Sequence, residues 1–112
     1  MGSLSSKKIS SPTQIMAATQ FVNDAIAHDN IVIFSKTYCS YCRAAKECFD
    51  KLKVSYKSIE LDNRNDMDDV QDALEKLTGA RSVPRVFING VFIGGGTEVK
   101  NMFKNGKLKE LI

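Results

Sequence analysis

The chain of 112 residues is 43% hydrophobic and 26% charged, which are ordinary values for one globular domain with a modest core. Its apolar runs are far too short to span a membrane, and a net charge of +3 without a basic block gives little support to nucleic-acid binding. The three cysteines are few and odd in number for a secreted, disulfide-stapled domain, and the N-terminus shows no apolar signal segment. We therefore expect a cytoplasmic protein whose thiols stay reduced unless they perform redox chemistry.

The first ten residues are expected to form a flexible leader, and residues 11–112 one folded domain. Within the leader, residues 1–6 fit the pattern for myristoylation of Gly2, although a tag remnant or a chance match also accounts for them. Ser11, Pro12 and Gln14 then form the pattern of a helix capping box. Apolar residues at helical spacing extend this predicted helix to about residue 28.

The next segments predict a parallel strand–helix–strand unit. Residues 31–34 are a continuous apolar run, typical of a strand that is buried on both faces of a sheet. A helix is predicted over residues 40–52 and a second strand over residues 54–61, joined by a right-handed connection. Acidic residues over 65–69 suit the first turn of a further helix, for which Gly79 is a suitable stop.

The clearest hairpin signal lies between residues 85 and 94. Asn89 and Gly90 suit a two-residue type I′ turn between two apolar strands. Thr97 is expected to cap a last long helix, and a short closing helix is expected after Gly106. Together the elements predict an α/β domain: a four-stranded mixed sheet, made of a parallel pair and an antiparallel hairpin, with helices on both faces.

Cys39 and Cys42 stand three apart, where the first predicted strand gives way to a helix. Backbone N–H groups at a helix N-terminus favour an anionic sulfur, and Lys36 adds positive charge nearby. The thiolate is the nucleophilic form of cysteine, and Cys42 is placed to close a disulfide with Cys39. Such a pair beside a strand–helix–strand unit predicts thioredoxin-like redox chemistry.

Other uses of the cysteines are less favoured. A structural zinc site needs four ligands, and only Cys48 and His28 remain as candidates, without a pairing pattern. A disulfide that closes a four-residue loop would constrain little of the unfolded chain. Cys48 itself lies on the apolar stripe of its helix, so we expect a small buried side chain. Pro84 is consistent with a simple strand start or with a cis Val83–Pro84 bond.

Three motifs agree with one known family: KTYCSYC at residues 36–42, SVP at 82–84 and GGGTE at 94–98. In their order and spacing, residues 14–112 resemble a dithiol glutaredoxin. The resemblance implies a thioredoxin fold, a cis Pro84, and glutathione-dependent reduction of protein–glutathione mixed disulfides and protein disulfides. It implies that Cys39 is the nucleophile and Cys42 the resolving thiol. The glutathione-binding residues it implies are Lys36, Tyr41, Gln71, Ser82, Val83, Pro84, Gly95, Gly96, Thr97 and Glu98.

The same resemblance implies a role for each part of that set. Lys36 and Gln71 would hold the glycine carboxylate of glutathione, and Tyr41 would lie beside its sulfur. The backbone of Val83 would pair with the cysteinyl unit. Thr97 and Glu98, at the start of a helix, would bind the γ-glutamyl end of glutathione. The implied partners are glutathione, glutathionylated or disulfide-bearing proteins and, through glutathione, glutathione reductase.

Two positions depart from the usual family pattern. Glu98 stands where the family usually has Asp, and Ser40 stands where it usually has Pro. The CSYC motif resembles that of glutaredoxins that share a [2Fe-2S] cluster between two subunits. No metal is expected in the monomer, whereas in a dimer the Cys39 of each subunit and two glutathiones would supply four thiolates. The alternative function is therefore a cluster-binding carrier or redox sensor.

Two further classes stay open but are less favoured. A thioredoxin-type enzyme served by a flavoprotein reductase would lack the glutathione-binding residues. A non-catalytic module of the same fold would not need the intact pair of Cys39 and Cys42.

Overall fold

The computed structural model describes residues 9–112; residues 1–8, with the myristoylation pattern and most of the expected leader, lie outside the described residues. The elements in chain order are α1 (Pro12–His28), β1 (Ile31–Ser35), α2 (Ser40–Lys51), β2 (Lys57–Glu60), the 3₁₀ turn η1 (Leu61–Asn63), α3 (Met67–Thr78), β3 (Arg85–Ile88), β4 (Val91–Gly94), α4 (Gly96–Lys104) and α5 (Lys107–Leu111). None of the described helices is long and apolar enough to cross a membrane.

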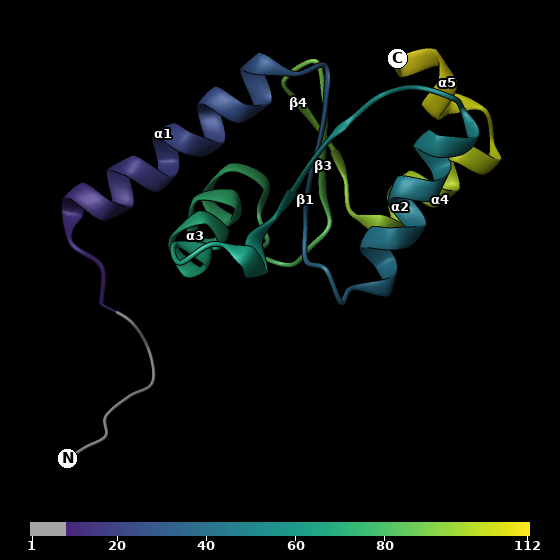
Figure 1. Cartoon of the computed structure of the whole chain (residues 1–112). Helices are drawn as coiled ribbons and strands as arrows, with labels where there is room; N and C mark the ends of the chain where they lie inside the picture. The colour runs from purple at the N-terminus through teal and green to yellow at the C-terminus, as the bar shows by residue number, and fades with distance from the viewer. Residues whose placement is uncertain (1–8) are drawn as a thin grey trace.

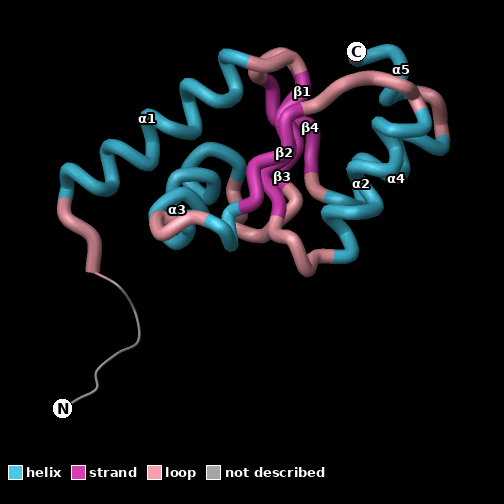
Figure 2. Tube along the Cα trace, viewed as in Figure 1, coloured by secondary structure: helices cyan, strands magenta, loops and turns pink. Residues whose placement is uncertain are grey.

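The sheet forms a middle layer between two groups of helices. Helices α1 and α3 cover one face, and α2, α4 and α5 cover the other (Figures 1 and 2). The strand order is β2-β1-β3-β4. Strand β1 pairs in parallel with β2 and antiparallel with β3, and β3 and β4 form an antiparallel hairpin. This is the mixed four-stranded sheet predicted from the sequence.

Strand β1 lies at the centre of this arrangement, and all five of its residues are buried. Because successive strand residues face opposite sides, Val32 and Phe34 pack toward α1 and α3, while Ile31 and Ile33 pack toward α2 and α4. The predicted burial of Cys48 is confirmed, since it packs in the second of these cores with 6% of its surface exposed. Cys39 and Cys42 therefore follow a strand that is buried along its whole length.

Strand β2 is shorter than predicted, covering residues 57–60 instead of 54–61. The N–H of Val54 donates to the carbonyl of Phe49 at 3.3 Å, so the segment after α2 stays bonded to the helix end. Leu61 then begins η1 and leaves the sheet. Apolar alternation alone does not show these two departures.

The predicted turn chemistry is confirmed at three element ends. The capping box joins Ser11 and Gln14 by two hydrogen bonds of 2.8 and 3.1 Å. Asn89 and Gly90 both have positive φ, at 51° and 80°, as a type I′ turn requires. Gly79 ends α3 in the left-handed conformation, with φ of 94°.

The expected cap of α4 is wrong by two residues. Gly95, in extended conformation, is the N-cap, and Thr97 lies inside the first turn. The reason is the side chain of Glu98, whose Oε1 accepts a hydrogen bond from the Gly95 N–H at 2.7 Å. This bond satisfies the N-cap amide, which has no partner within the helix, so the helix begins before the threonine.

Candidate active site

Cys39 occupies the N-cap position of α2, in extended conformation, after the loop that leaves β1. Its Sγ accepts a hydrogen bond from the N–H of Cys42 at 3.2 Å, and its own N–H donates to the carbonyl of Lys36 at 3.1 Å. The side chain is half-buried, so a substrate sulfur can reach it. An N–H donor at a helix N-terminus stabilises an anionic sulfur, which is the reactive form of a cysteine.

Cys42 lies one helical turn further along and is fully buried. The pKa of its thiol is raised to about 11, mainly by burial and then by the hydrogen bond with Cys39, while contacts with Lys36 and Ser35 oppose the rise. Both cysteines are free thiols, as is Cys48. The pair therefore combines an accessible sulfur with a protonated, inaccessible one.

The loop before β3 faces Cys39. The Val83–Pro84 bond is cis, as the family resemblance implied. The carbonyl of Val83 lies 3.8 Å from the Sγ of Cys39. Pro84 is buried, whereas Ser82 is exposed. The second predicted motif thus lies directly beside the first.

The third motif closes the site from the side of α4. A Cβ placed on Gly96 would lie 3.1 Å from the Cβ of Tyr41, so the absence of a side chain lets α4 approach the start of α2. Gly95 and Gly96 are buried, whereas Thr97, Glu98 and Tyr41 are exposed. The exposed side chains of Tyr41, Thr97 and Glu98 and the sulfur of Cys39 thus lie around one area of the surface.

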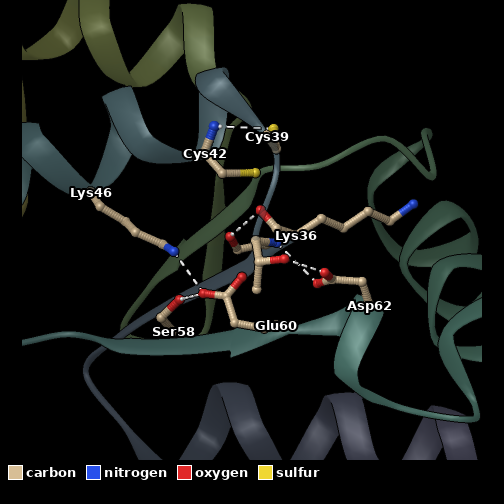
Figure 3. Close-up of polar contacts among 9 residues, drawn as sticks. Lys36, Cys39, Cys42, Lys46, Ser58, Glu60 and Asp62 are labelled. Atoms are coloured by element: carbon tan, nitrogen blue, oxygen red, sulfur yellow. Dashed lines mark hydrogen bonds and ion pairs between the residues drawn. The ribbon is translucent and has the colours of Figure 1, made fainter.

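Lys36 and Gln71 are placed differently from one another. Lys36 is half-buried in the active-site loop and extends away from Cys42 and Lys46 (Figure 3). Gln71 is buried, and its Nε2 donates to the carbonyl of Arg81 at 2.7 Å. The structure therefore brings Lys36 to the surface beside Cys39, but bonds the amide nitrogen of Gln71 to the loop before Ser82.

The sequence reasoning missed Arg85, which braces that loop. Its guanidinium donates to the carbonyl of Pro84 and to the hydroxyl of Thr78, both at 3.3 Å, and lies 4.9 Å from the ring centre of Phe92. Burial lowers the pKa of Arg85, and the nearby carboxylate of Glu98 opposes the change. An arginine directly after the proline of the motif is the only signal in the sequence.

Asp62 was also missed, and it anchors the active-site loop. Its carboxylate accepts hydrogen bonds from the N–H of Thr37, at 3.0 Å, and from the Thr37 hydroxyl (Figure 3). The hydrogen bond from the Thr37 hydroxyl lowers the pKa of Asp62, and the charge of Lys36 adds a smaller effect. The two residues are 25 positions apart, so only the pairing of β1 with β2 reveals the contact.

A partly buried polar cluster, consisting of Ser35, Lys46, Ser58 and Glu60, lies below Cys42 (Figure 3) and was not foreseen either. The Oε2 atom of Glu60 accepts from the ammonium of Lys46 and from the hydroxyl of Ser58, both at 2.6 Å (Figure 3). Among the described residues, no group of three or more His, Cys, Asp and Glu side chains could hold a metal ion. The cluster is thus an ion pair with hydroxyl partners, placed directly behind the reactive cysteines.

Comparison with known proteins gives a consistent picture. The family model described as Glutaredoxin matches residues 31–93. The chain is 50% identical over 99 residues to "Glutaredoxin-2, mitochondrial" from Bos taurus, covering 86% of this chain and 63% of that protein. It is 48% identical over 91 residues to the Homo sapiens protein of the same name, covering 81% and 56%. The chain thus spans about three fifths of the length of these relatives.

A solved structure described as a buckwheat glutaredoxin–glutathione complex has the same fold. Its TM-score is 0.87 at 41% identity, with 91% of this chain and 93% of that chain covered. The expected thioredoxin fold, with its four-stranded mixed sheet and flanking helices, is confirmed by this likeness.

The expected cytoplasmic location is wrong in the light of the comparisons, because the bovine and human relatives are both named as mitochondrial. Cysteine number and a missing secretory signal distinguish an oxidising compartment from a reducing one, but not one reducing compartment from another. The resemblance seen in the three motifs is confirmed: the chain belongs to the glutaredoxin family.

Proposed function

We propose that this chain is a glutathione-dependent thiol–disulfide oxidoreductase that reduces protein–glutathione mixed disulfides and protein disulfides. The observation that carries the proposal is the contrast within one helical turn. Cys39 is accessible and receives a backbone N–H at 3.2 Å, whereas Cys42 is fully buried and holds its proton tightly. The first suits a nucleophile, and the second suits a thiol that reacts only with Cys39.

On a glutathionylated protein, the Cys39 thiolate attacks the glutathione sulfur. The mixed disulfide breaks, the protein sulfur leaves as a thiolate, and Cys39 is joined to glutathione. A second glutathione thiolate attacks that bond, releases glutathione disulfide and restores Cys39. This cycle needs only one enzyme thiol.

On a protein disulfide, Cys39 forms a mixed disulfide with the target, and Cys42 then attacks Cys39. The target leaves reduced, and a Cys39–Cys42 disulfide remains. Two glutathiones reduce that disulfide in turn. Glutaredoxins as a class have reduction potentials of about −200 to −230 mV, near the poise of the glutathione pool, so the cycle can run in either direction.

Glutathione would lie on the surface that the three motifs surround. The ammonium of Lys36 suits the glycine carboxylate, and the carboxylate of Glu98 suits the γ-glutamyl ammonium. The carbonyl oxygen of Val83 lies 3.8 Å from the Sγ of Cys39. The backbone of Val83 therefore suits hydrogen bonding with the cysteinyl unit of glutathione. The complex of the buckwheat relative with glutathione supports this proposal. We also infer a mitochondrial location from the names of the relatives, which immunodetection in fractionated cells checks.

The test is a coupled assay that follows NADPH oxidation with glutathione, glutathione reductase and a glutathionylated protein as substrate. Turnover that depends on both the chain and glutathione supports the proposal. The absence of turnover with freshly reduced protein contradicts it.

The [2Fe-2S] alternative stays a prediction from the CSYC motif, and no contact among the described residues adds support. A colourless monomer after anaerobic reconstitution with iron, sulfide and glutathione would contradict it.

A further inference from the structure

The carboxyl group of Glu60 is bonded unevenly. Its Oε2 accepts two hydrogen bonds of 2.6 Å, from Lys46 and Ser58, whereas its Oε1 is buried and accepts none. The large majority of buried side-chain polar atoms have a hydrogen-bond partner, so a buried carboxylate oxygen without one calls for an explanation. Glu60 has no part in the glutathione surface proposed above.

Ser35 connects this oxygen to the active site. Ser35 and Glu60 are register partners in the parallel pair of β1 and β2, and two residues paired across adjacent strands project to the same face of the sheet. The Ser35 hydroxyl is fully buried and donates to the Lys36 carbonyl at 3.4 Å, which is a long and weak hydrogen bond. The same hydroxyl lowers the pKa of both the Cys42 thiol and the Glu60 carboxyl group, so it lies within reach of each.

The charges in this region favour an acceptor at Glu60. Burial raises the pKa of Glu60, but the hydrogen bonds from Lys46 and Ser58, the nearby hydroxyl of Ser35 and the charge of Lys46 outweigh burial and leave the pKa below its usual value. Glu60 is therefore an anion at neutral pH. Cys42, in contrast, is a neutral thiol without direct access to water, because none of its surface is exposed.

We propose that Glu60 takes up the proton of Cys42, through the hydroxyl of Ser35, when Cys42 closes the disulfide with Cys39. This proposal rests on the proposed two-cysteine reaction. The Ser35 hydroxyl is the group that would accept the Cys42 proton, since it acts on the pKa of that thiol, whereas Glu60 acts through Ser35 and is a positioning residue that receives the proton.

The step balances as follows. Cys42 Sγ forms a bond to Cys39 Sγ, the bond from Cys39 to the target breaks, and the target leaves as a thiolate with the electron pair. The Cys42 proton passes to the Ser35 oxygen, and the Ser35 hydroxyl proton passes to Glu60 Oε1. When glutathione later reduces the Cys39–Cys42 disulfide, Cys42 takes a proton back by the reverse route. Because 22% of the Glu60 side chain is exposed, its proton can also exchange with water.

The order of events follows from the two thiols. At rest the proton stays on Cys42, since the thiol holds it far more tightly than Glu60 does. The hydrogen bond and the charge of Cys39 both raise the pKa of Cys42, and both disappear when the Cys39 sulfur enters a mixed disulfide. A disulfide sulfur keeps no proton, so the transfer accompanies formation of the Cys39–Cys42 bond.

Other charged groups around Glu60 also influence how its protonation depends on pH. Lys46 faces it from α2, and Tyr56 precedes its own strand. The remaining charged or titratable groups share a surface cavity with Glu60 and come from α1, β2 and the segment before α3: Asp24, His28, Asp29, Lys57 and Arg64.

The test uses a chromogenic aromatic disulfide, 5,5′-dithiobis(2-nitrobenzoate), which reports both cysteines in one trace. Attack by Cys39 releases the first equivalent of coloured thiolate, and attack by Cys42 on the resulting mixed disulfide releases the second. Cys48→Ser serves as the background throughout. The released thiolate needs no proton, so the second phase reports the fate of the Cys42 proton.

In Glu60→Gln the second phase should slow by at least about tenfold at pH 7, the lower end of what positioned proton acceptors contribute, while the first phase stays within about twofold. The native second phase should be nearly independent of pH from about 6 to 8. In Glu60→Gln the rate of the second phase should rise about tenfold per pH unit, because hydroxide must then remove the proton of Cys42. Ser35→Ala should behave like Glu60→Gln, and Glu47→Gln, an exposed carboxylate on α2, should match the native protein.

An unchanged second phase in Glu60→Gln and Ser35→Ala would overturn the proposal. A slower second phase that keeps the native pH profile would also overturn it, because Glu60 would then act only on packing. If Glu60→Gln fails to fold, the slope in Ser35→Ala decides. Glutathione-dependent turnover of the unaltered chain is measured in parallel; its absence would contradict the proposed function, whereas the two-phase trace still tests the proton route.

Discussion

Cys39 and Cys42 share one helical turn and the same chemical group, yet their surroundings differ in almost every respect. Cys39 faces outward, at an element junction where the backbone supplies a donor and three loops leave a surface open. Cys42 faces inward, toward the end of β1 and the partly buried polar cluster, with no exposed surface. The difference shows that a two-residue spacer is enough to separate a sulfur that meets substrates from one that meets only its neighbour, because a helix turns the second side chain toward the core.

The sharpest way to break this comparison is to remove one sulfur at a time. Cys39→Ser should lower turnover of glutathionylated protein by a thousandfold or more, on the order of losing a catalytic nucleophile. Cys42→Ser should keep that turnover within a few-fold and lose most reduction of protein disulfides. The coupled assay with each substrate measures both. Cys48→Ser, a buried thiol away from the site, is the control, and equal losses in Cys39→Ser and Cys42→Ser would contradict the assigned roles.

The next prediction concerns Lys36, the cationic side chain on the surface around Cys39. Lys36→Ala should raise KM for glutathione about tenfold, since a hydrogen bond to a charged group contributes about 1.5–3 kcal/mol. The value of kcat should change little, because Lys36 is proposed to bind and not to react. Lys104→Ala, an exposed lysine at the end of α4, is the matched control. An unaltered KM would remove Lys36 from the proposed site.

The opposite end of that surface depends on Glu98. Glu98→Gln keeps an oxygen that can accept from the Gly95 N–H, now at 2.7 Å, but removes the negative charge. KM for glutathione should therefore rise by up to about fivefold while the melting temperature stays nearly constant, because an exposed charged contact contributes up to about 1 kcal/mol. Glu110→Gln on α5 controls for net charge. A lower melting temperature with an unchanged KM would mean that Glu98 only caps α4.

The sequence predicted most of what local patterns determine. The apolar run at 31–34, the capping box at Ser11 and the Asn89–Gly90 turn each act through neighbours within a few residues, and each was placed correctly. Resemblance supplied the cis bond before Pro84, which local reasoning left open. In the structure, the three family motifs at residues 36–42, 82–84 and 94–98 lie around Cys39.

The sequence did not predict contacts that depend on strand pairing or on competition for one donor. Glu60 meets Ser35 because β2 lies in register with β1, and Asp62 reaches Thr37 for the same reason. Thr97 is not the N-cap of α4, because the Glu98 side chain accepts a hydrogen bond from the Gly95 N–H and the helix begins there. These outcomes are set by tertiary structure, so no window of the sequence contains them.

The smallest expected effect concerns stability at alkaline pH, and it isolates Cys42. Its pKa in the folded protein is about 11, raised mainly by burial from an ordinary value of 9.0. A group whose folded pKa is raised contributes stability that is fully present below its unfolded pKa and is lost as pH rises through the window between the two values. The melting temperature of the native protein should therefore fall from about pH 9 to pH 11 by a few degrees more than that of Cys42→Ser, which has no thiol to ionise there. Thermal unfolding followed by circular dichroism in reducing buffer measures the difference, with Glu110→Gln, an exposed carboxylate on α5, as the control. Parallel curves for Cys42→Ser and the native protein would show that Cys42 loses its proton as readily in the folded chain as in the unfolded one, and the contrast between the two sulfurs would then rest on access alone.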